Sequence, residues 1–471
     1  MREVFIMGNS AFLPGSKTAV VTLNKTYDAG FIEDGVDTPI EVTPASGSED
    51  GVPKEVEFMP FGSNNNLPLE IMKKIGDNTI VGSNVEFKAN LACGAGLVVG
   101  KKEQTEGGKM EFRELSRSDV PAVFEFLENC NYSRVMQEIA NDMVVFGDSF
   151  VQLCLGRSAD DEVSGVATLL HREMCFSRVS KQDEKTRKIL YHGYSSLFGK
   201  EASPEDVVVT PLLSRKNPLY DLRVRQGILP SPETGETVCE KAANYVMSLN
   251  LPVPGRYYYN RPYWWSIFLD WYEFSCAIPK FKKALIQNQM VLKYHVSVNS
   301  GFYAKLYKSQ GIPDSDPKKQ AAAKKKFLQN LDEFLSGAEN AGKSFVSAFD
   351  YDKVNKYQVD DIVIKPIESF IKGGEYIEDS EEATNVICNT MGVHPSLKGA
   401  SPGKSKNING TEARELFIIA QVLFTPIREM MVLPLYLVKE LNGWDKALEF
   451  RVSNMMLTTL DKGTGSVKVI S

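Results

Sequence analysis

The chain has 471 residues, of which 43% are hydrophobic and 24% are charged, and its formal net charge is −6 at pH 7. That length predicts about two to four folding units with enough apolar mass for a sizeable core. The acidic balance excludes a protein that binds nucleic acid over its whole surface, so any such contact must be local.

The cysteines and histidines predict no metal site and no cofactor. The seven cysteines form no CxxC pair, and the four histidines are scattered along the chain. Unpaired, irregularly spaced cysteines are typical of reduced thiols in a cytosolic protein. The apolar run at the N-terminus is too short for a signal peptide.

The first part of the chain predicts an arm followed by helices and then strands. Residues 1–60 are rich in Gly, Pro, Thr, Asp and Glu, which favours an extended arm. Helical periodicity follows in four segments, 67–76, 83–93, 119–129 and 132–145. Residues 149–213 alternate as short strands, and the Pro and Gly residues at 250–260 indicate a boundary.

A row of apolar residues with a spacing of seven begins after this boundary. The row consists of Trp264, Trp271, Ile278, Leu285 and Leu292. This spacing predicts a long helix that packs lengthwise on its neighbours, with a kink or a break at Pro279. The seam suits contact between subunits and packing inside one chain equally well, and both alternatives stay open.

A compact insert and a second long helix come next. Strands are expected at 293–299, 343–350 and 358–364, with a lysine-rich helix at 317–335. A second long helix is expected at 368–391, and one of its faces is acidic. That face consists of Glu375, Glu378, Asp379, Glu381 and Glu382. An acidic face is usually solvated, and the alternative is a face that lines a channel.

The most apolar stretch lies near the C-terminus. The stretch 416–438 is long enough to cross a bilayer as a helix, but Arg428 and Glu429 lie at its middle. Charges at the bilayer centre are costly, so we expect two buried helical pieces and no membrane span. A last strand is expected at 448–452.

Residues 337–344 (GAENAGKS) satisfy the P-loop pattern GxxxxGK[ST]. A P-loop requires a strand before the loop and a helix after it, so that the helix N-terminus faces the phosphates. Here the predicted helix precedes the loop and the predicted strand follows it. We therefore expect a helix end at Gly337 and a tight turn at Gly342, and no enzyme. A P-loop NTPase that uses residues 337–344 is the alternative.

The order of these features resembles the portal protein family of tailed bacteriophages, from about residue 60 to 455. Residues 142–151 (DMVVFGDSFV) are similar to the family's helix that runs into a strand, and 337–343 are similar to its G-x-x-N-A-G-K turn. Residues 387–399 (ICNTMGVHPSLKG) resemble a further motif, with His394 where the family often has proline. Each motif is weak by itself, and the specificity comes from their order.

The resemblance implies a mixed α+β, portal-like fold with a helical and β-containing wing, two long stem helices, a small α/β clip, a tunnel loop and a long helix. The implied parts are an N-terminal arm (1–60), the wing (61–261), the first stem helix (262–292), the clip (293–364), the second stem helix (365–392), the tunnel loop (393–410), the long wing helix with a return strand (411–455), and a tail (456–471) with a short or absent crown.

The resemblance also implies the function. Family members form closed homo-oligomeric rings, generally of twelve subunits, at the capsid portal vertex, and double-stranded DNA passes through the ring during packaging and ejection. The implied partners are the terminase large subunit, the head–tail adaptor, and the major capsid and scaffold proteins, with no membrane. The implied location is the virion and, during assembly, the cytoplasm of the bacterial host. Another head–tail connector or a minor capsid structural protein is the alternative.

The resemblance assigns roles to four sets of residues. The tunnel loop would contact DNA phosphates without reading bases through Lys398, Ser401, Lys404, Ser405, Lys406 and Asn407. The alternative, which stays open, is a mobile loop whose lysines only aid solubility. The acidic face of the second helix would line the channel, and the row that begins at Trp264 would form part of the subunit interface. The clip turn would contain Gly337, Asn340, Gly342 and Lys343.

Overall fold

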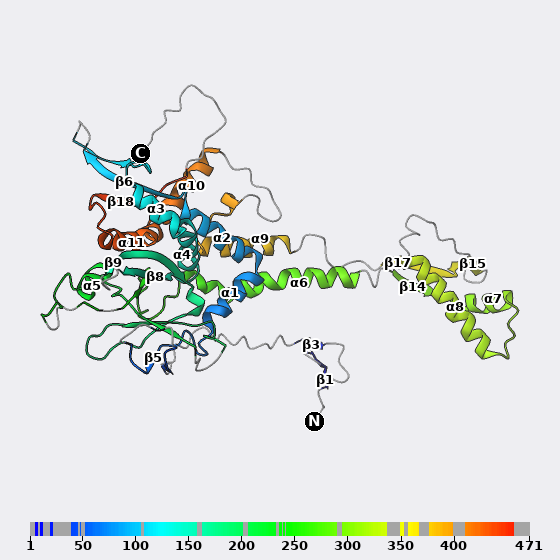
Figure 1. The fold of residues 1–471 in the computed structure, drawn as a ribbon. Helices are drawn as coiled ribbons and strands as arrows, with labels where there is room; N and C mark the ends of the chain where they lie inside the picture. The colour runs from blue at the N-terminus through cyan, green and yellow to red at the C-terminus, as the bar shows by residue number, and fades with distance from the viewer. Residues whose placement is uncertain are drawn as a thin grey trace, which may run out of the picture. The chain divides into compact units, whose positions relative to one another are not determined.

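The chain divides into two compact units, and each is described by itself. In this computed structural model, unit 1 contains Met1–Cys276 and Asp379–Ser471, and unit 2 contains Ala277–Glu378 (Figure 1). The residues that the structure describes are 5–7, 10–12, 19–21, 39–45, 48, 52–104, 108–157, 163–200, 206–231, 235–237, 239–240, 242–289, 294–336, 349–352, 357–366, 376–398 and 410–455. The fold is mixed α+β, as the sequence predicts.

The described helices of unit 1 come from both of its chain segments. They are α1 (Leu67–Asp77), α2 (Thr79–Cys93), α3 (Pro121–Asn129), α4 (Tyr132–Phe146), α5 (Pro218–Arg225), α10 (Gly410–Leu423), α11 (Thr425–Leu441) and most of α9 (Ile377–Thr390), with the short 3-10 helices η1 (Met174–Phe176), η2 (Tyr263–Phe268) and η4 (Pro395–Lys398). Residues next to each helix in the sequence determine where it begins and ends. The Asn78 side chain accepts hydrogen bonds from the N–H groups of Ile80 and Val81 and so begins α2.

The described strands of unit 1 form small antiparallel sheets. Their orders are β13–β8–β9, β18–β6–β7, β10–β11–β12, β4–β5 and β1–β2–β3. The strands are β1 (Phe5–Met7), β2 (Ser10–Phe12), β3 (Ala19–Val21), β4 (Ile40–Val42), β5 (Val56–Phe58), β6 (Leu97–Gln104), β7 (Met110–Glu114), β8 (Asp148–Arg157), β9 (Val163–Arg172), β10 (Ser177–Val179), β11 (Tyr191–Tyr194), β12 (Val208–Pro211), β13 (Asn244–Asn250) and β18 (Leu448–Val452).

Helix α4 lies at the centre of the core of unit 1. It packs on β8 and β9, and α2 and α11 pack on α4 (Figure 1). Its buried residues Val135, Ile139 and Met143 recur every fourth position, which places them on one face of the helix. Gly147 ends α4 in a left-handed conformation with φ of 70°, and β8 begins at the next residue. This is the helix-to-strand passage that the sequence predicts at 142–151.

The expected N-terminal arm is too long. In β5, Val56 and Phe58 are buried in a small core with Phe198, Val207 and Val209. Composition alone misses this strand, because three residues with Gly and Pro nearby carry little periodicity. The last part of the predicted arm therefore belongs to the folded body of unit 1.

Unit 2 contains the insert. Helix α6 (Trp271–Gln289) begins in unit 1 and continues into unit 2 from Ala277. The other described elements of unit 2 are β14 (Tyr294–Val298), α7 (Ser300–Ser309), α8 (Pro317–Ser336), β15 (Phe349–Asp352), β16 (Tyr357–Asp360) and β17 (Ile362–Pro366). Strand β14 pairs antiparallel with β17, and β15 pairs with β16. The aromatic rings of Phe302 on α7 and Phe327 on α8 lie 5.0 Å apart between centroids.

Several predicted boundaries differ from the structure. The first long helix begins at Trp271 rather than 262, because Tyr263–Phe268 form a 3-10 helix, and it continues through Pro279 without a break. Residues 365 and 366, expected in the second long helix, end β17. Residues 343–348 lie outside the described residues, but β15 extends beyond the expected end at 350 to Asp352. The strand expected at 358–364 is split at Asp361 into β16 and β17.

Candidate functional site

The base of the predicted tunnel loop is held by one lysine. The short helix η4 ends at Lys398, immediately before residues 399–409, which lie outside the described part of the chain. The Lys398 ammonium donates hydrogen bonds to Oδ1 of Asn84, at 2.7 Å, and to Oγ of Ser83, both on α2. Partial burial lowers the pKa of Lys398 from its usual value. Lys398 therefore anchors the start of the loop to the body of unit 1.

Asn84 connects this lysine to α9. Its side chain is fully buried, and its Nδ2 lies 3.4 Å from Sγ of Cys388 and 3.6 Å from Sδ of Met391. Sequence reasoning missed Asn84, although a polar residue among the apolar positions of α2 is the signal that could have found it. A buried amide requires partners. Asn84 finds them on a segment about three hundred residues further along the chain.

The other residues expected to contact DNA cannot be placed. Ser401, Lys404, Ser405, Lys406 and Asn407 lie outside the described residues, and so do Gly337, Asn340, Gly342 and Lys343 of the predicted clip turn. Of the predicted loop donors, only Lys398 is described, and its ammonium is already bonded within the chain.

The acidic residues of α9 lie away from its buried face. Ala383, Thr384, Ile387 and Cys388 point into the core, whereas Glu378 and Glu382 are exposed and Asp379 and Glu381 are half-buried. Glu375 lies outside the described residues. Glu378 and Glu382 are thus available to solvent or to another molecule.

The row expected to pack between subunits starts inside the chain's own core. Trp264 is buried in η2, and its indole N–H donates a hydrogen bond to the Val144 carbonyl, at 3.2 Å. Trp271 is half-buried and Ile278 is buried, whereas the side chain of Leu285 and all of Leu292 lie outside the description. For Trp264, packing inside the chain is the alternative that the structure supports.

Helix α10 differs from the prediction. Of the two apolar pieces expected to be buried, α11 is buried along most of its length, but four side chains of α10 are 56–66% exposed. These are Ile418, Ile419, Val422 and Leu423. In the described chain no single helix is long and apolar enough to cross a membrane, and α10 with α11 meets the criteria only as a pair bent by 46°.

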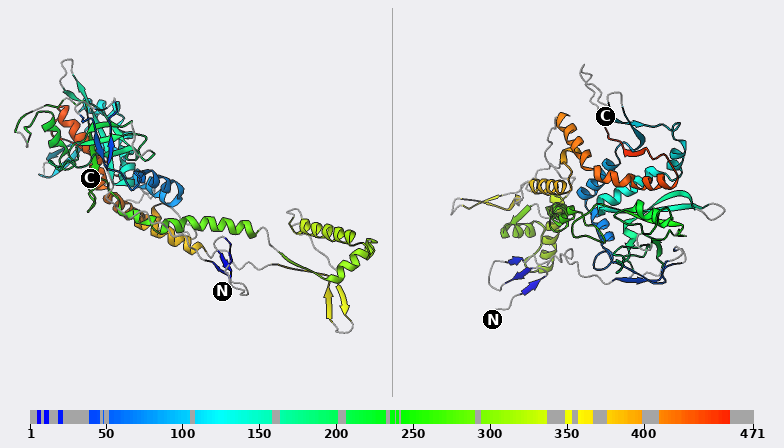
Figure 2. Two further views of the ribbon diagram at one scale, coloured as in Figure 1. Left: turned by 90° about the horizontal axis from the view of Figure 1, so that it is seen from below. Right: turned by 90° about the vertical axis from the view of Figure 1, so that its left-hand side faces the viewer.

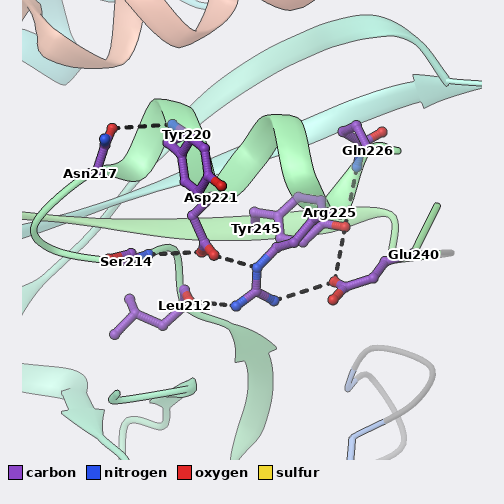
Figure 3. Close-up of polar contacts among 9 residues, drawn as sticks. All are labelled: Leu212, Ser214, Asn217, Tyr220, Asp221, Arg225, Gln226, Glu240 and Tyr245. Atoms are coloured by element: carbon purple, nitrogen blue, oxygen red, sulfur yellow. Dashed lines mark hydrogen bonds and ion pairs between the residues drawn. The ribbon is translucent and has the colours of Figure 1, made fainter. Parts of the chain in front are cut away.

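The buried Arg225 forms the centre of a polar cluster on α5 (Figure 3). Its guanidinium contacts Asp221 at 3.0 Å, Glu240 at 3.3 Å and the Leu212 carbonyl at 3.2 Å. Asp221 also accepts a hydrogen bond from the Ser214 N–H, at 2.9 Å. Burial opposes the charge on Arg225, but the two carboxylates outweigh it and raise its pKa. Because these groups satisfy one another, the cluster fixes α5 to its neighbours and leaves no reactive group.

Two buried carboxyl groups have structural partners as well. Asp142 accepts hydrogen bonds from the Met174 N–H, at 2.9 Å, and from His171, at 2.8 Å. Asp148 accepts two from Asn260, at 2.7 and 3.0 Å, and burial raises its pKa to about 6. Within the described residues, His, Cys, Asp and Glu form no group of three suited to a metal ion.

The structure is similar to solved structures of phage-like particles. It matches a chain of the virion of a native gene transfer agent (GTA) particle with a TM-score of 0.50 and 13% identity, over 81% of this chain and 82% of that chain. It matches a chain from the neck of an empty GTA particle computed with C6 symmetry with a TM-score of 0.50 and 13% identity, over 81% and 83% of the two chains. The fold is shared. No family model and no curated protein matches the sequence.

Proposed function

We propose that this chain is a structural subunit of the head–tail connection of a phage-like particle, and that it is the portal subunit. The observation that carries this proposal is the shared fold, which extends over 81% of the chain and over 83% of a chain from a GTA neck. The sequence resemblance supports the same assignment independently, since it rests on motifs and not on the fold.

In this proposal about twelve copies form a ring at the capsid vertex, and double-stranded DNA passes through the ring during packaging and ejection. Unit 1 corresponds to the wing with the bases of the stem helices, and the insert in unit 2 corresponds to the clip. The chain order supports this assignment, because α6 leads into the insert and α9 leads out of it.

The charge of unit 2 supports a docking role for the insert. Residues 277–378 contain 16 lysines and 12 acidic side chains, in a chain that is acidic overall. Lys318, Lys319, Lys325 and Lys326 of α8 are exposed. A basic surface favours a partner with an acidic one. We propose the terminase large subunit and the head–tail adaptor as these partners, and the capsid and scaffold proteins as partners of unit 1.

The ring can be tested with purified protein. Negative-stain microscopy should show rings with a central hole, and mass photometry should show a species of about twelve times the monomer mass of 52.4 kDa. Particles that stay monomeric at every protein concentration tested would contradict the proposal. Assemblies without a hole would favour a different head–tail structural protein.

We propose that the chain is not a P-loop NTPase. Helix α8 ends at Ser336, directly before residues 337–344, so a helix precedes the motif where a P-loop needs a strand. A test compares wild type with Lys343→Ala for binding of a fluorescent ATP analogue in the presence of Mg²⁺. We expect no saturable binding by either protein, and saturable binding that only the wild type shows would contradict the proposal.

A further inference from the structure

One face of α10 is apolar and exposed. It consists of Ile418, Ile419, Val422 and Leu423, which share one side of the helix because they lie three or four positions apart. Figure 2 shows α10 at the periphery of unit 1. Contiguous apolar side chains that are more than half exposed mark an interaction surface. We call these four residues the α10 patch.

Gln421 lies at the edge of this patch. Its neighbours Ala420 and Phe424 belong to the core of unit 1, and Gln421 itself is buried. Since an α-helix turns about 100° per residue, Ile418 lies about 60° and Val422 about 100° around the helix from Gln421. Ala420 and Phe424 lie on the other side of Gln421. The α10 patch therefore begins where the buried face of α10 ends.

The chain arrives at this edge after its last strand. Beyond Val452, where β18 ends, the Asn454 side chain accepts a hydrogen bond from Arg428 of α11. Met455 then meets Gln421 of α10. The Gln421 side chain accepts a hydrogen bond from the Met455 N–H, at 2.8 Å, and donates one to the Met455 carbonyl, at 2.9 Å. The last described residue is therefore fixed at the edge of the α10 patch, after a run that leads from α11 to α10.

The residues that follow begin with apolar side chains. Residues 456–471 lie outside the described part of the chain, and their sequence is MLTTLDKGTGSVKVIS. Met456, Leu457 and Leu460 thus come directly after the fixed Met455. Apolar side chains at this point of the chain have an apolar surface within reach.

The reach can be estimated from chain geometry. Five residues of extended chain span up to about 17 Å. Ile419, on the far part of the patch, lies about 160° around the helix from Gln421, which is about 15 Å along the surface of a helix with a diameter of about 10–12 Å. The segment 456–460 is therefore long enough to cross the α10 patch from the point where Met455 is held.

We propose that residues 456–460 fold across the α10 patch of their own copy and cover it. Met456, Leu457 and Leu460 supply apolar side chains for an apolar surface, and the contact removes both from water. Because Met455 is already fixed at the edge of the patch, these residues meet it at a high effective concentration, which favours them over a segment of another molecule. The contact holds α10, which begins where the predicted tunnel loop ends. It concerns one copy and does not rest on the proposed ring.

The first test identifies what covers the patch. A photo-crosslinking amino acid is placed at position 419 of the full chain, and the irradiated chains are separated by denaturing electrophoresis before mass spectrometry. Crosslinks to residues 456–460 in the band of the 52.4-kDa monomer are the expected result. The same amino acid at position 228, where Ile228 is 55% exposed, should give no crosslinks to these residues.

Other crosslinks from position 419 would overturn the inference. Crosslinks in a band of about twice the monomer mass would show that another copy covers the patch. Irradiation that yields no crosslink to residues 456–460 would show that the segment does not lie there. Partitioning of the wild type into phosphatidylcholine vesicles that Ile419→Asp abolishes would show a patch that is open to lipid.

The second test measures whether the segment protects α10. Leu457→Asp combined with Leu460→Asp should make the amides of residues 418–423 exchange hydrogen about tenfold faster, because burying two carboxylates on the patch is costly. Amides of residues 132–146 in α4 report on the core of unit 1 in the same experiment and should exchange as in wild type.

A matched variant separates the contact from the added charge. Thr464→Asp combined with Ser466→Asp introduces the same charge into the same tail, beyond residue 460. Its residues 418–423 should exchange as in wild type. Unchanged exchange in the leucine variant, or equal acceleration in both variants, would overturn the inference.

The outcomes for this contact and for the proposed function are separate. If microscopy shows rings and position 419 does not crosslink to residues 456–460, only the assignment of the tail fails. If the crosslinks form and wild type gives no rings, the tail contact stands and the proposed function fails.

Discussion

The guanidinium of Arg428 donates a hydrogen bond to the main-chain oxygen of Leu91, at 2.8 Å, and a second one to Ala92, at 3.1 Å. These carbonyls belong to the last turn of α2, where a helix runs out of N–H donors, and the Leu91 oxygen also accepts a hydrogen bond from the Gly94 N–H, at 3.2 Å. Arg428 thus links α11 to the C-terminal end of α2. The charge that makes a membrane span costly in the sequence links two helices in the fold.

Replacing this arginine should destabilise unit 1. Arg428→Met keeps the apolar stem but removes the arginine's hydrogen bonds to the carbonyls of Leu91 and Ala92, of which Leu91 keeps the Gly94 N–H, so the free energy of unfolding should fall by about 1–3 kcal/mol. Urea denaturation followed by circular dichroism measures the change. The adjacent Glu429→Gln alters an exposed side chain and should leave the midpoint unchanged. An unchanged midpoint for Arg428→Met would show that the carbonyls find other donors.

Asp148 should make stability depend on pH. Burial raises its pKa to about 6 in the folded protein, against 3.8 for an ordinary carboxyl group. Between these pH values the folded state holds more protons than the unfolded state, so the contribution of Asp148 falls as the pH rises from 4 to 6. Above pH 6 the difference amounts to about 2–3 kcal/mol.

Asp148→Asn removes this contribution and keeps an oxygen that can accept hydrogen bonds from Asn260. The difference in unfolding free energy between wild type and the variant, measured from pH 4 to 7, should therefore change in favour of the variant as the pH rises. A difference that stays constant over this range would contradict the raised pKa.

Lys398 and the loop lysines should have separable effects. Lys398→Met removes the bonds to Ser83 and Asn84, so amide hydrogen exchange of residues 395–398 should become faster. Binding of a 30-base-pair DNA should fall more for Lys404→Gln with Lys406→Gln, because those lysines are the proposed phosphate donors. If Lys398→Met weakens DNA binding as much as the loop pair, Lys398 contacts the DNA as well as anchoring the loop.

The Asp221–Arg225 pair should show strong coupling. A double-mutant cycle with Asp221→Asn and Arg225→Met should give a coupling energy of about 1–3 kcal/mol, because both side chains are largely buried and share further partners. The pair Arg134–Glu138 has the same spacing on a helix and is exposed. A cycle on that pair should give a smaller coupling, and similar values for the two cycles would mean that burial does not strengthen the first.

Most helices and several strands could be predicted from local sequence. The segments at 67–76 and 132–145 become α1 and α4, and the strand at 448–452 is β18 to the residue. Apolar periodicity and the residues that begin or end a helix act over a few neighbouring positions, so they can be recognised from the sequence alone. Residues 97–104 form β6, which was not predicted because its partner β18 lies more than three hundred residues away. The neighbouring β7 (110–114), which pairs with β6, was missed with it.

The sequence by itself determined the order of helix, insert and helix, the passage from helix to strand at 142–151 and the helix that precedes the P-loop pattern, because all of these depend on neighbours along the chain. Only the tertiary structure decided that Trp264 faces inward, that Asn84 meets Lys398 and Cys388, and that Ile418, Ile419, Val422 and Leu423 of α10 are exposed. Apolar periodicity predicts which side of a helix avoids water, but which residues cover that side depends on segments distant in sequence.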